Sequence, residues 1–163
     1  MKRLILLAAL ALPGCGLQPL YGGGAGSAVA SSLSRVEVAP IEGRNGWLLA
    51  NALRDRLAAT PGRPPLYRLE IRLDDQITGL GVRRDDTVTR ERRTIRARYQ
   101  LVALDKGTTM LDATAGSDAG LDVVGSEYAT IAAESTAAER LSEIIADKIV
   151  ARVALYARRT PAP

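Results

Sequence analysis

The chain contains no histidine and no phenylalanine, and its only cysteine is Cys15. Without histidine, the usual general base, the histidine-containing catalytic triads and the mixed Cys/His metal sites are excluded. There is no phosphate-binding G-x-x-x-x-G-K-[ST] loop, and the glycines of 22–26 (GGGAG) follow a tyrosine rather than a strand. We therefore expect no cofactor, no metal and no catalytic residue.

A single cysteine has no disulfide partner in its own chain, so Cys15 is a buried apolar residue, a reactive thiol or a site of covalent modification. The residues before it favour the last of these. Lys2 and Arg3 precede an unbroken apolar run, 4–12 (LILLAALAL), which is too short for a membrane-spanning helix of roughly 20 residues. This charge pattern and length are typical of a secretory signal peptide, which we assign to residues 1–14.

The signal ends in Leu12-Pro13-Gly14-Cys15, which is similar to the bacterial lipobox, although proline is less usual at its position. In that class the cysteine sulfur receives a diacylglycerol, the chain is cut before the cysteine, and the new amino terminus is acylated. Several acyl chains anchor firmly, because each buried methylene contributes about 0.8 kcal/mol. The alternative is an ordinary signal peptide with an incidental cysteine. By analogy with enteric bacteria, glycine rather than aspartate at position 16 favours the outer membrane.

The remainder of the chain predicts one tethered domain. Residues 15–32 contain the acylated cysteine and a flexible stretch of small residues (GGGAGSAVASS), 33–158 form the domain, and 159–163 are a C-terminal tail. No apolar run after Cys15 is long enough to cross a membrane as a helix.

Hydrophobic periodicity predicts the order β-α-β-β-β-α. Short alternation around Val36 and Val38 indicates a strand, and leucines four apart within 44–60 indicate an amphipathic helix. Alternation at 66–74, its return at 94–104 and the segment TTMLDATAG predict an antiparallel meander, with the turn Asp105-Lys106-Gly107 before its last strand. A helical period runs from Ser126 to Arg158. We expect an α+β two-layer sandwich with two helices on one face of a four-stranded sheet. The core-facing strand residues are expected to be Tyr67, Leu69, Ile71 and Leu73, then Ile95, Ala97, Tyr99 and Leu101.

The most basic segment is 82–100, with seven arginines against three acidic residues. Arginine binds phosphate and carboxylate in a bidentate fork and keeps its charge. The candidate ligands for an anionic lipid or glycolipid are Arg90, Arg92, Arg93, Arg96 and Arg98, of which all but Arg93 share one strand parity. The alternative is that these charges keep an exposed sheet face soluble and protect its edge. Nucleic acid is disfavoured because the aromatic residues for base stacking are missing.

Two segments resemble the LptE family of lipopolysaccharide-assembly lipoproteins, particularly its alphaproteobacterial members. The start CGLQPLYGG, at 15–23, is similar to the opening of the mature proteins, and SEYATIAAESTAAERLSEIIADKIVARVALY, at 126–156, is similar to their C-terminal helix. Leu17 stands where enteric members often have an aromatic residue.

The resemblance implies the two-helix, four-stranded sandwich read above. It also implies an outer-membrane lipoprotein that plugs the lumen of the LptD β-barrel, helps the barrel to assemble, and assists lipopolysaccharide delivery to the cell surface. Lipopolysaccharide would then be the ligand of the arginines, an assignment that rests on their charge.

Two alternatives remain open: a generic lipid-anchored periplasmic lipoprotein with protein partners only, or a lipid-anchored envelope hydrolase. The hydrolase would need a pair of carboxylates, for which Asp74-Asp75 and Asp85-Asp86 are the adjacent acids.

Overall fold

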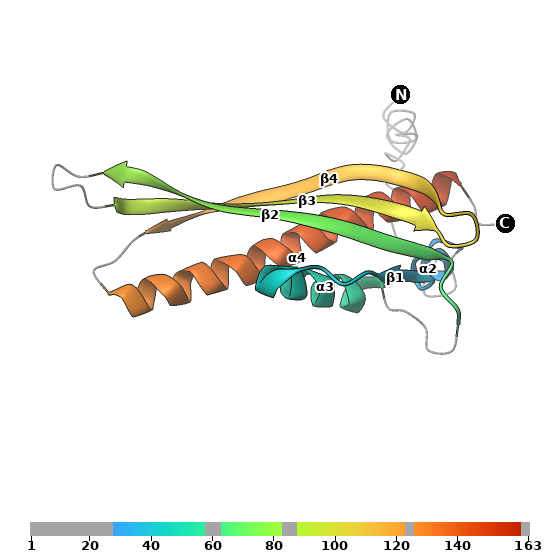
Figure 1. The fold of residues 1–163 in the computed structure, drawn as a ribbon, viewed down its shortest axis with the longest axis horizontal. Helices are drawn as coiled ribbons and strands as arrows, with labels where there is room; N and C mark the ends of the chain where they lie inside the picture. The colour runs from blue at the N-terminus through green and yellow to red at the C-terminus, as the bar shows by residue number, and fades with distance from the viewer. Residues whose placement is uncertain (1–27, 58–62, 83–87, 123–125, 161–163) are drawn as a thin grey trace, which may run out of the picture.

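The computed structural model describes residues 28–57, 63–82, 88–122 and 126–160. Seven elements follow one another in these ranges. They are α2 (Ala28–Leu33), β1 (Val36–Val38), α3 (Gly43–Leu57), β2 (Tyr67–Val82), β3 (Val88–Ala103), β4 (Thr108–Asp122) and α4 (Glu127–Arg159) (Figure 1).

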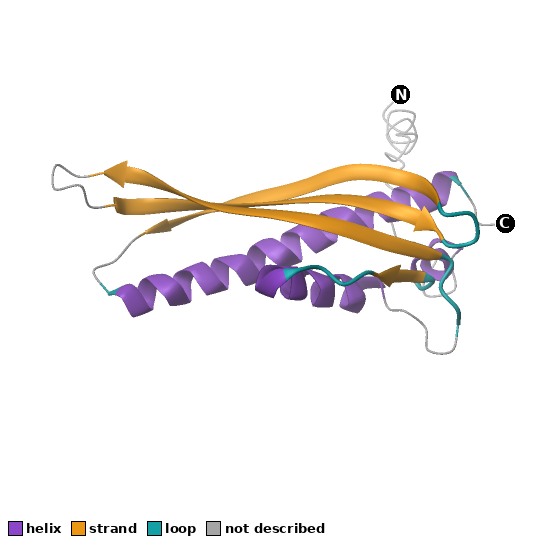
Figure 2. Cartoon of the chain, in the orientation of Figure 1, coloured by secondary structure: helices purple, strands orange, loops and turns teal. Residues whose placement is uncertain are grey.

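The strands form one mixed sheet in the order β1-β2-β3-β4, in which β1 is parallel to β2 and the other neighbours are antiparallel. Helices α3 and α4 lie together on one side of this sheet (Figure 2). The predicted α+β sandwich and its order β-α-β-β-β-α are therefore confirmed. The added element is α2, which occupies the end of the stretch predicted to be a flexible linker. It is helical there because Leu33 is buried in the core and Val29 packs against it.

Helices α3 and α4 run in the same direction. Two side-chain contacts join them, one near the start of α3 and one near its end. The Arg44 guanidinium donates to Ser135 Oγ at 2.8 Å, and twelve residues further along both helices Arg56 pairs with Asp147. Helix α4 begins at Ser126, whose side chain accepts from the Ala129 N–H, and it ends with Arg158 and Arg159 in the last turn. Acceptors at the start and cations at the end both suit the helix dipole.

The core lies between the helices and the inner face of the sheet, by which we mean the face turned toward α3 and α4. Its fully buried side chains are Leu49 and Leu53 of α3, Leu69, Ile95 and Leu101 of the sheet, and Leu141, Ile145, Ile149 and Val153 of α4. The predicted facing of the strands is confirmed for Leu69, Ile71, Ile95, Ala97, Tyr99 and Leu101, which are all buried, while Tyr67 and Leu73 are partly buried against the core.

The three long strands extend well beyond the predicted segments. Strand β2 continues past Asp74 to Val82, with register shifts at Gly79 and Gly81, and β3 begins at Val88 rather than near Thr94. The turn from β3 to β4 is closed as predicted, because Gly107 takes a positive φ of 62° and its N–H donates to Ala103 O at 2.9 Å. The result is a long, narrow sheet. Its far end, where β2 ends and β3 begins, lies beyond the start of α3 (Figure 1).

Candidate functional site: the outer face of the sheet

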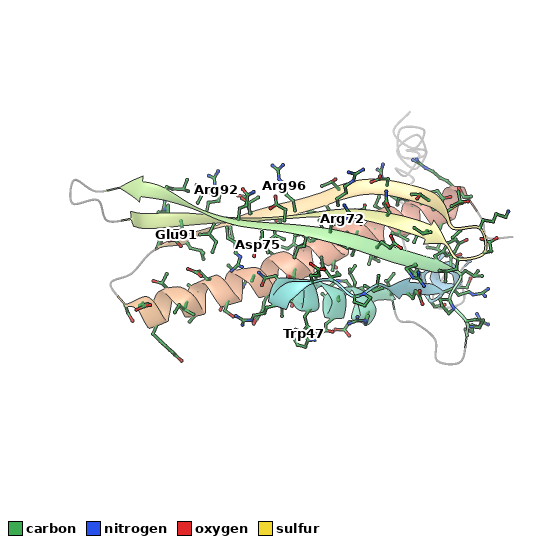
Figure 3. All side chains as sticks on the ribbon, viewed as in Figure 1. Trp47, Arg72, Asp75, Glu91, Arg92 and Arg96 are labelled. Carbon is green, nitrogen blue, oxygen red and sulfur yellow. The ribbon has the colours of Figure 1, made fainter. Side chains whose placement is uncertain are left out.

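The outer face of the sheet, which is turned away from α3 and α4, carries four of the five predicted arginines. Ile95, Ala97 and Tyr99 of β3 are buried on the inner face, so the residues between them must point outward. Arg90, Arg92, Arg96 and Arg98 are accordingly exposed. Figure 3 shows Arg92 and Arg96 directed away from the helices.

Three of these arginines are paired with aspartates of β4. Arg90 Nε lies 3.1 Å from Asp122 Oδ1, Arg98 Nη2 lies 3.0 Å from Asp112 Oδ2, and Arg92 Nε lies 3.9 Å from Asp118 Oδ2. The antiparallel register of β3 and β4 brings these residues within reach, because it aligns Arg90 with Asp122 and Gln100 with Asp112. The neighbouring strand therefore offsets much of the positive charge that β3 concentrates.

The described part of this face is in fact balanced in formal charge. Register and alternation place six arginines on it, Arg68, Arg72, Arg90, Arg92, Arg96 and Arg98, and six acids, Glu37, Glu70, Asp74, Asp112, Asp118 and Asp122. Of these six arginines, Arg72 and Arg96 make no ion pair with another described residue. These two guanidinium groups are thus the ones on the face best placed to take an external anion.

The Arg98–Asp112 pair alters the acidity of both groups. Hydrogen bonds from Arg98 and Gln100 lower the pKa of Asp112 below its ordinary value, and the same hydrogen bond to Asp112 raises the pKa of Arg98. Asp112 therefore stays ionised, and the pair keeps its charges, across neutral and mildly acidic pH.

Arg93 does not belong to this surface, although the sequence analysis grouped it with the other four. It shares the parity of Ile95, so it faces α4 and is 8% exposed. Its Nε and Nη2 donate to the Asp75 carboxylate at 3.0 and 2.6 Å, and its Nη1 donates to Glu134 O at 2.9 Å. The hydrogen bond to Asp75 holds the pKa of Arg93 above its usual range. Asn45 of α3 donates to the same carboxylate, so the group joins both helices to the sheet.

Of the adjacent acids considered for catalysis, Asp74 and Asp75 lie among the described residues, and their carboxylates point to opposite faces of the sheet. Asp75 faces Arg93 and the helices, whereas Asp74 is exposed on the outer face opposite Arg96. Asp85 and Asp86 lie outside the described residues. Within the described ranges, no group of three or more acidic, histidine or cysteine side chains could hold a metal ion.

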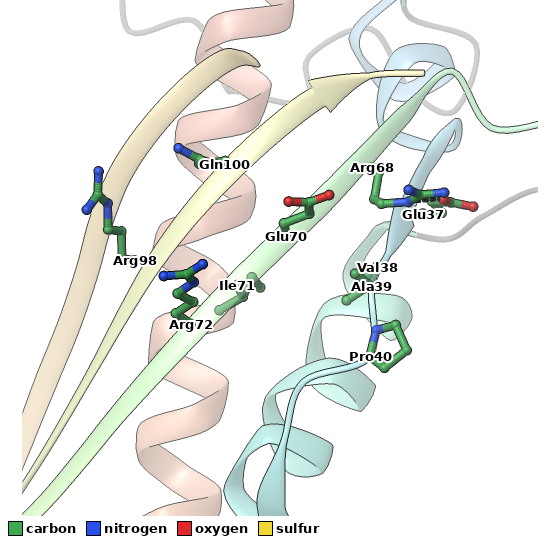
Figure 4. A pocket seen from close by; sticks show the side chains of 10 residues that line it. All are labelled: Glu37, Val38, Ala39, Pro40, Arg68, Glu70, Ile71, Arg72, Arg98 and Gln100. Carbon is green, nitrogen blue, oxygen red and sulfur yellow. Dashed lines mark hydrogen bonds and ion pairs between the residues drawn. The ribbon is translucent and has the colours of Figure 1, made fainter. Parts of the chain in front are cut away.

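A groove of about 790 Å³ opens where β1 ends beside β2 (Figure 4). Val38, Ala39 and Pro40 line one side, while Ile71, Arg72 and Arg98 lie across from them. Arg68, also in the lining, is paired with Glu37 at 2.7 Å. The alternation of 66–74 already pointed Arg72 to the outer face, but its place at this groove depends on where β1 stops.

No helix in the described ranges is both long and apolar enough to span a membrane. Cys15, the predicted lipidation site, lies outside the described residues.

The fold and this face together define an elongated α+β sandwich with a charged outer sheet surface. Residues 33–153 match the model of the LptE family, described as lipopolysaccharide-assembly. The chain therefore belongs to the LptE family.

Solved structures share this fold. A presumed lipoprotein from Caulobacter crescentus is 30% identical, with a TM-score of 0.67, and the match covers 78% of this chain and 94% of that one. Rare lipoprotein B from Shewanella oneidensis shares the fold at 10% identity, with a TM-score of 0.60 and coverage of 76% and 95%. A minor lipoprotein from Acinetobacter baumannii does so at 13% identity, with a TM-score of 0.59 and coverage of 80% and 98%. No curated protein gives a significant match to the chain.

Proposed function

We propose that this protein is an outer-membrane lipoprotein of lipopolysaccharide assembly that occupies the lumen of an LptD-type β-barrel. The observation that carries the proposal is the family match, which extends over 33–153 and so includes nearly the whole sandwich. In this function the chain contributes a folded surface rather than a catalytic group.

Co-purification tests the barrel partner. Tagged protein solubilised from membranes should retain one large outer-membrane β-barrel in a stable complex. Isolation with other envelope proteins but without such a barrel would favour the alternative of a generic envelope lipoprotein.

The proposed anchor is a lipid on Cys15. Its support is the apolar run followed by Leu12-Pro13-Gly14-Cys15, together with the lipoprotein description of the Caulobacter crescentus structure. Cys15→Ala should abolish incorporation of radioactive fatty acid into the protein, with wild type as the positive control. Equal labelling of the two proteins would refute lipidation at this residue.

The proposed ligand of the outer face is lipopolysaccharide, whose phosphates and carboxylates suit arginine forks. The support is the set of exposed arginines at 90, 92, 96 and 98, although their aspartate partners make the surface less cationic than the sequence of β3 alone suggests. Arg93 supports the layers instead, so we leave it out of the proposed binding surface.

A charge-matched pair of variants tests this ligand. Changing Arg92, Arg96 and Arg98 together to Ser should weaken binding of purified lipopolysaccharide, and the loss should shrink as salt screens the wild-type interaction. The control changes three exposed arginines of the helices, Arg54, Arg140 and Arg152, to Ser, which removes the same charge from the other side of the molecule. If both triple variants bind as tightly as wild type across a salt series, the outer face has only a solubilising role.

A further inference from the structure

The sheet has an open edge along β2 that begins where β1 stops. Strand β2 is 16 residues long, but β1 pairs only with Tyr67, Arg68 and Leu69. The last backbone hydrogen bond on that side joins the Ala39 N–H to Leu69 O at 3.0 Å. In the described part of the chain, no other strand lies beside β2 on this edge.

The direction of the free backbone groups follows from the bonds that β1 makes. Tyr67 donates its N–H to Arg35 O, and Leu69 O accepts from Ala39, so the odd residues of β2 turn their backbone groups toward β1. Because this direction alternates along a strand, Ile71, Leu73 and Asp75 present theirs to the same side beyond the end of β1. An exposed row of this kind is a template for another strand.

Side chains at the edge indicate what kind of strand would fit. Within β1, Glu37 lies opposite Arg68 and accepts a hydrogen bond from its Nε at 2.7 Å. Four residues further along β2, Arg72 lines the groove without an ion-pair partner in the described residues, and its direct cross-strand neighbour on β3 is another arginine, Arg98. Asp112 already pairs with Arg98 from the other side, so an acid at the next position of the edge would supply the ion-pair partner that Arg72 lacks.

We propose that the groove at the end of β1 binds an extended segment of a partner protein, which adds to the β2 edge as a parallel strand with a carboxylate opposite Arg72. The added strand runs beside β2 from Ile71 onward, in the direction of β1 and beyond Ala39, which already occupies the edge at Leu69. Its acidic residue turns its own backbone groups toward β2, as Glu37 does, and accepts the Leu73 N–H. This site lies at the sheet edge and does not depend on the function proposed above.

The probe is a fluorescein-labelled capped peptide, Val-Glu-Val-Lys-Val-Ser, which begins opposite Ile71, beyond Ala39, and places Glu opposite Arg72 and Lys opposite Asp74. Fluorescence anisotropy should detect saturable binding to the purified mature domain. Arg72→Glu should weaken it at least tenfold, and should favour a second peptide, Val-Lys-Val-Lys-Val-Ser, over the first. Hydrogen exchange of the Leu73 amide should slow when the first peptide is present.

Backbone recognition is tested separately from charge. Leu73→Pro removes an N–H that points away from β3, a position at which an edge strand tolerates proline, and it should abolish binding. Leu73→Ala loses the same side chain but keeps the N–H, and should bind. A peptide N-methylated at its glutamate should fail to bind to any variant, which keeps the test valid if Leu73→Pro does not fold.

Two outcomes would overturn the proposal. Equal binding of the N-methylated and unmodified peptides would mean that the groove recognises charge alone, as an anionic lipid headgroup would require. Absence of binding by either charged peptide at millimolar concentration would mean that the edge accepts no added strand of this chemistry.

Discussion

The two faces of the long sheet contain ion pairs of the same chemistry in opposite surroundings. Arg93 and Arg98 are five residues apart on β3, and each binds an aspartate of a neighbouring strand. On the inner face the side chains of Arg93 and Asp75 are 10% and 21% exposed, whereas on the outer face those of Arg98 and Asp112 are 68% and 38% exposed.

The difference shows that burial, rather than the presence of a partner, decides whether an ion pair in this molecule stabilises the fold. Arg93 has little access to water, and its third nitrogen, Nη1, donates to a carbonyl of α4, so its charge serves the packing of the layers. Arg98 keeps most of its surface in solvent, where water and salt compete for both partners. The inner pair is therefore expected to stabilise the fold, and the outer pair to leave its charges available.

The largest expected effect is at the inner pair. Arg93→Ala leaves the Asp75 carboxylate beneath the helices with only Asn45 as a partner, and loss of one member of a buried pair costs about 3–5 kcal/mol. Urea denaturation measures the free energy of unfolding. The control is Arg96→Ala, three residues further along the same strand and exposed. If the two variants lose equal stability, the contrast between the faces is wrong.

A double variant sharpens this result. Replacing both members together, Asp75→Leu with Arg93→Leu, removes the uncompensated charge and should recover part of the lost stability. No recovery would mean that the hydrogen bonds to Asn45 and Glu134, rather than the unpaired charge, account for the loss.

A smaller effect is expected from a core side chain of the same inner face. Ile71 is 9% exposed, so Ile71→Ala should lower the free energy of unfolding by about 2 kcal/mol, the low end for such truncations. Ile77 lies six residues further along β2 and is 43% exposed, so Ile77→Ala should cost clearly less in the same urea experiment. Equal costs would show that the helices support the far end of the sheet as fully as its centre.

On the outer face, Arg98→Ala should leave the urea midpoint at neutral pH unchanged within error. The reason is that both members of the pair are largely solvated, and exposed pairs contribute little. A clear drop in the midpoint would mean that the outer pair is structural as well, and would remove the distinction drawn here.

The smallest effect concerns the acidity of Asp112, which its hydrogen bonds to Arg98 and Gln100 keep below the ordinary value. A depressed pKa in the folded state favours folding above the unfolded pKa, and this contribution disappears as the pH falls through the folded pKa. NMR titration of the Asp112 carboxyl should show a low pKa in wild type and a higher one in Arg98→Ala. Identical titrations would mean that the pair does not persist in solution.

Strand alternation was sufficient to predict the facing of the sheet where the inner face is apolar. Leu69, Ile71, Ile95 and Leu101 alternate with charged or polar residues, and burying one face of such a strand fixes its orientation. The same alternation placed Arg72, Arg96 and Arg98 on the outer face. The orientations of these side chains therefore follow from the local sequence.

Alternation failed at the far end of the sheet because polar residues occupy the inner face there. Asp75 and Arg93 interrupt the apolar pattern, and Glu91 also lies on the helix side (Figure 3). Charged side chains that pair across strands, rather than apolar residues, occupy the inner face there. The alternating apolar pattern therefore predicted strands that are too short, and Arg93 was grouped with the exposed arginines. The aspartates of β4 were also missed as partners, because their pairing depends on a register between strands that no local pattern encodes.

The length of β2 sets a distance as well as a surface. Sixteen residues at about 3.3 Å each extend roughly 50 Å. Helix α2 lies at one end of the sheet, and the end of β2 with the start of β3 lies at the other (Figure 1). The proposed lipid anchor, joined to the domain at α2, would act at one end of a rod that is longer than a bilayer with its headgroups, about 40–45 Å thick. In the proposed barrel lumen, a rod of this length standing upright would extend across the full thickness of the membrane.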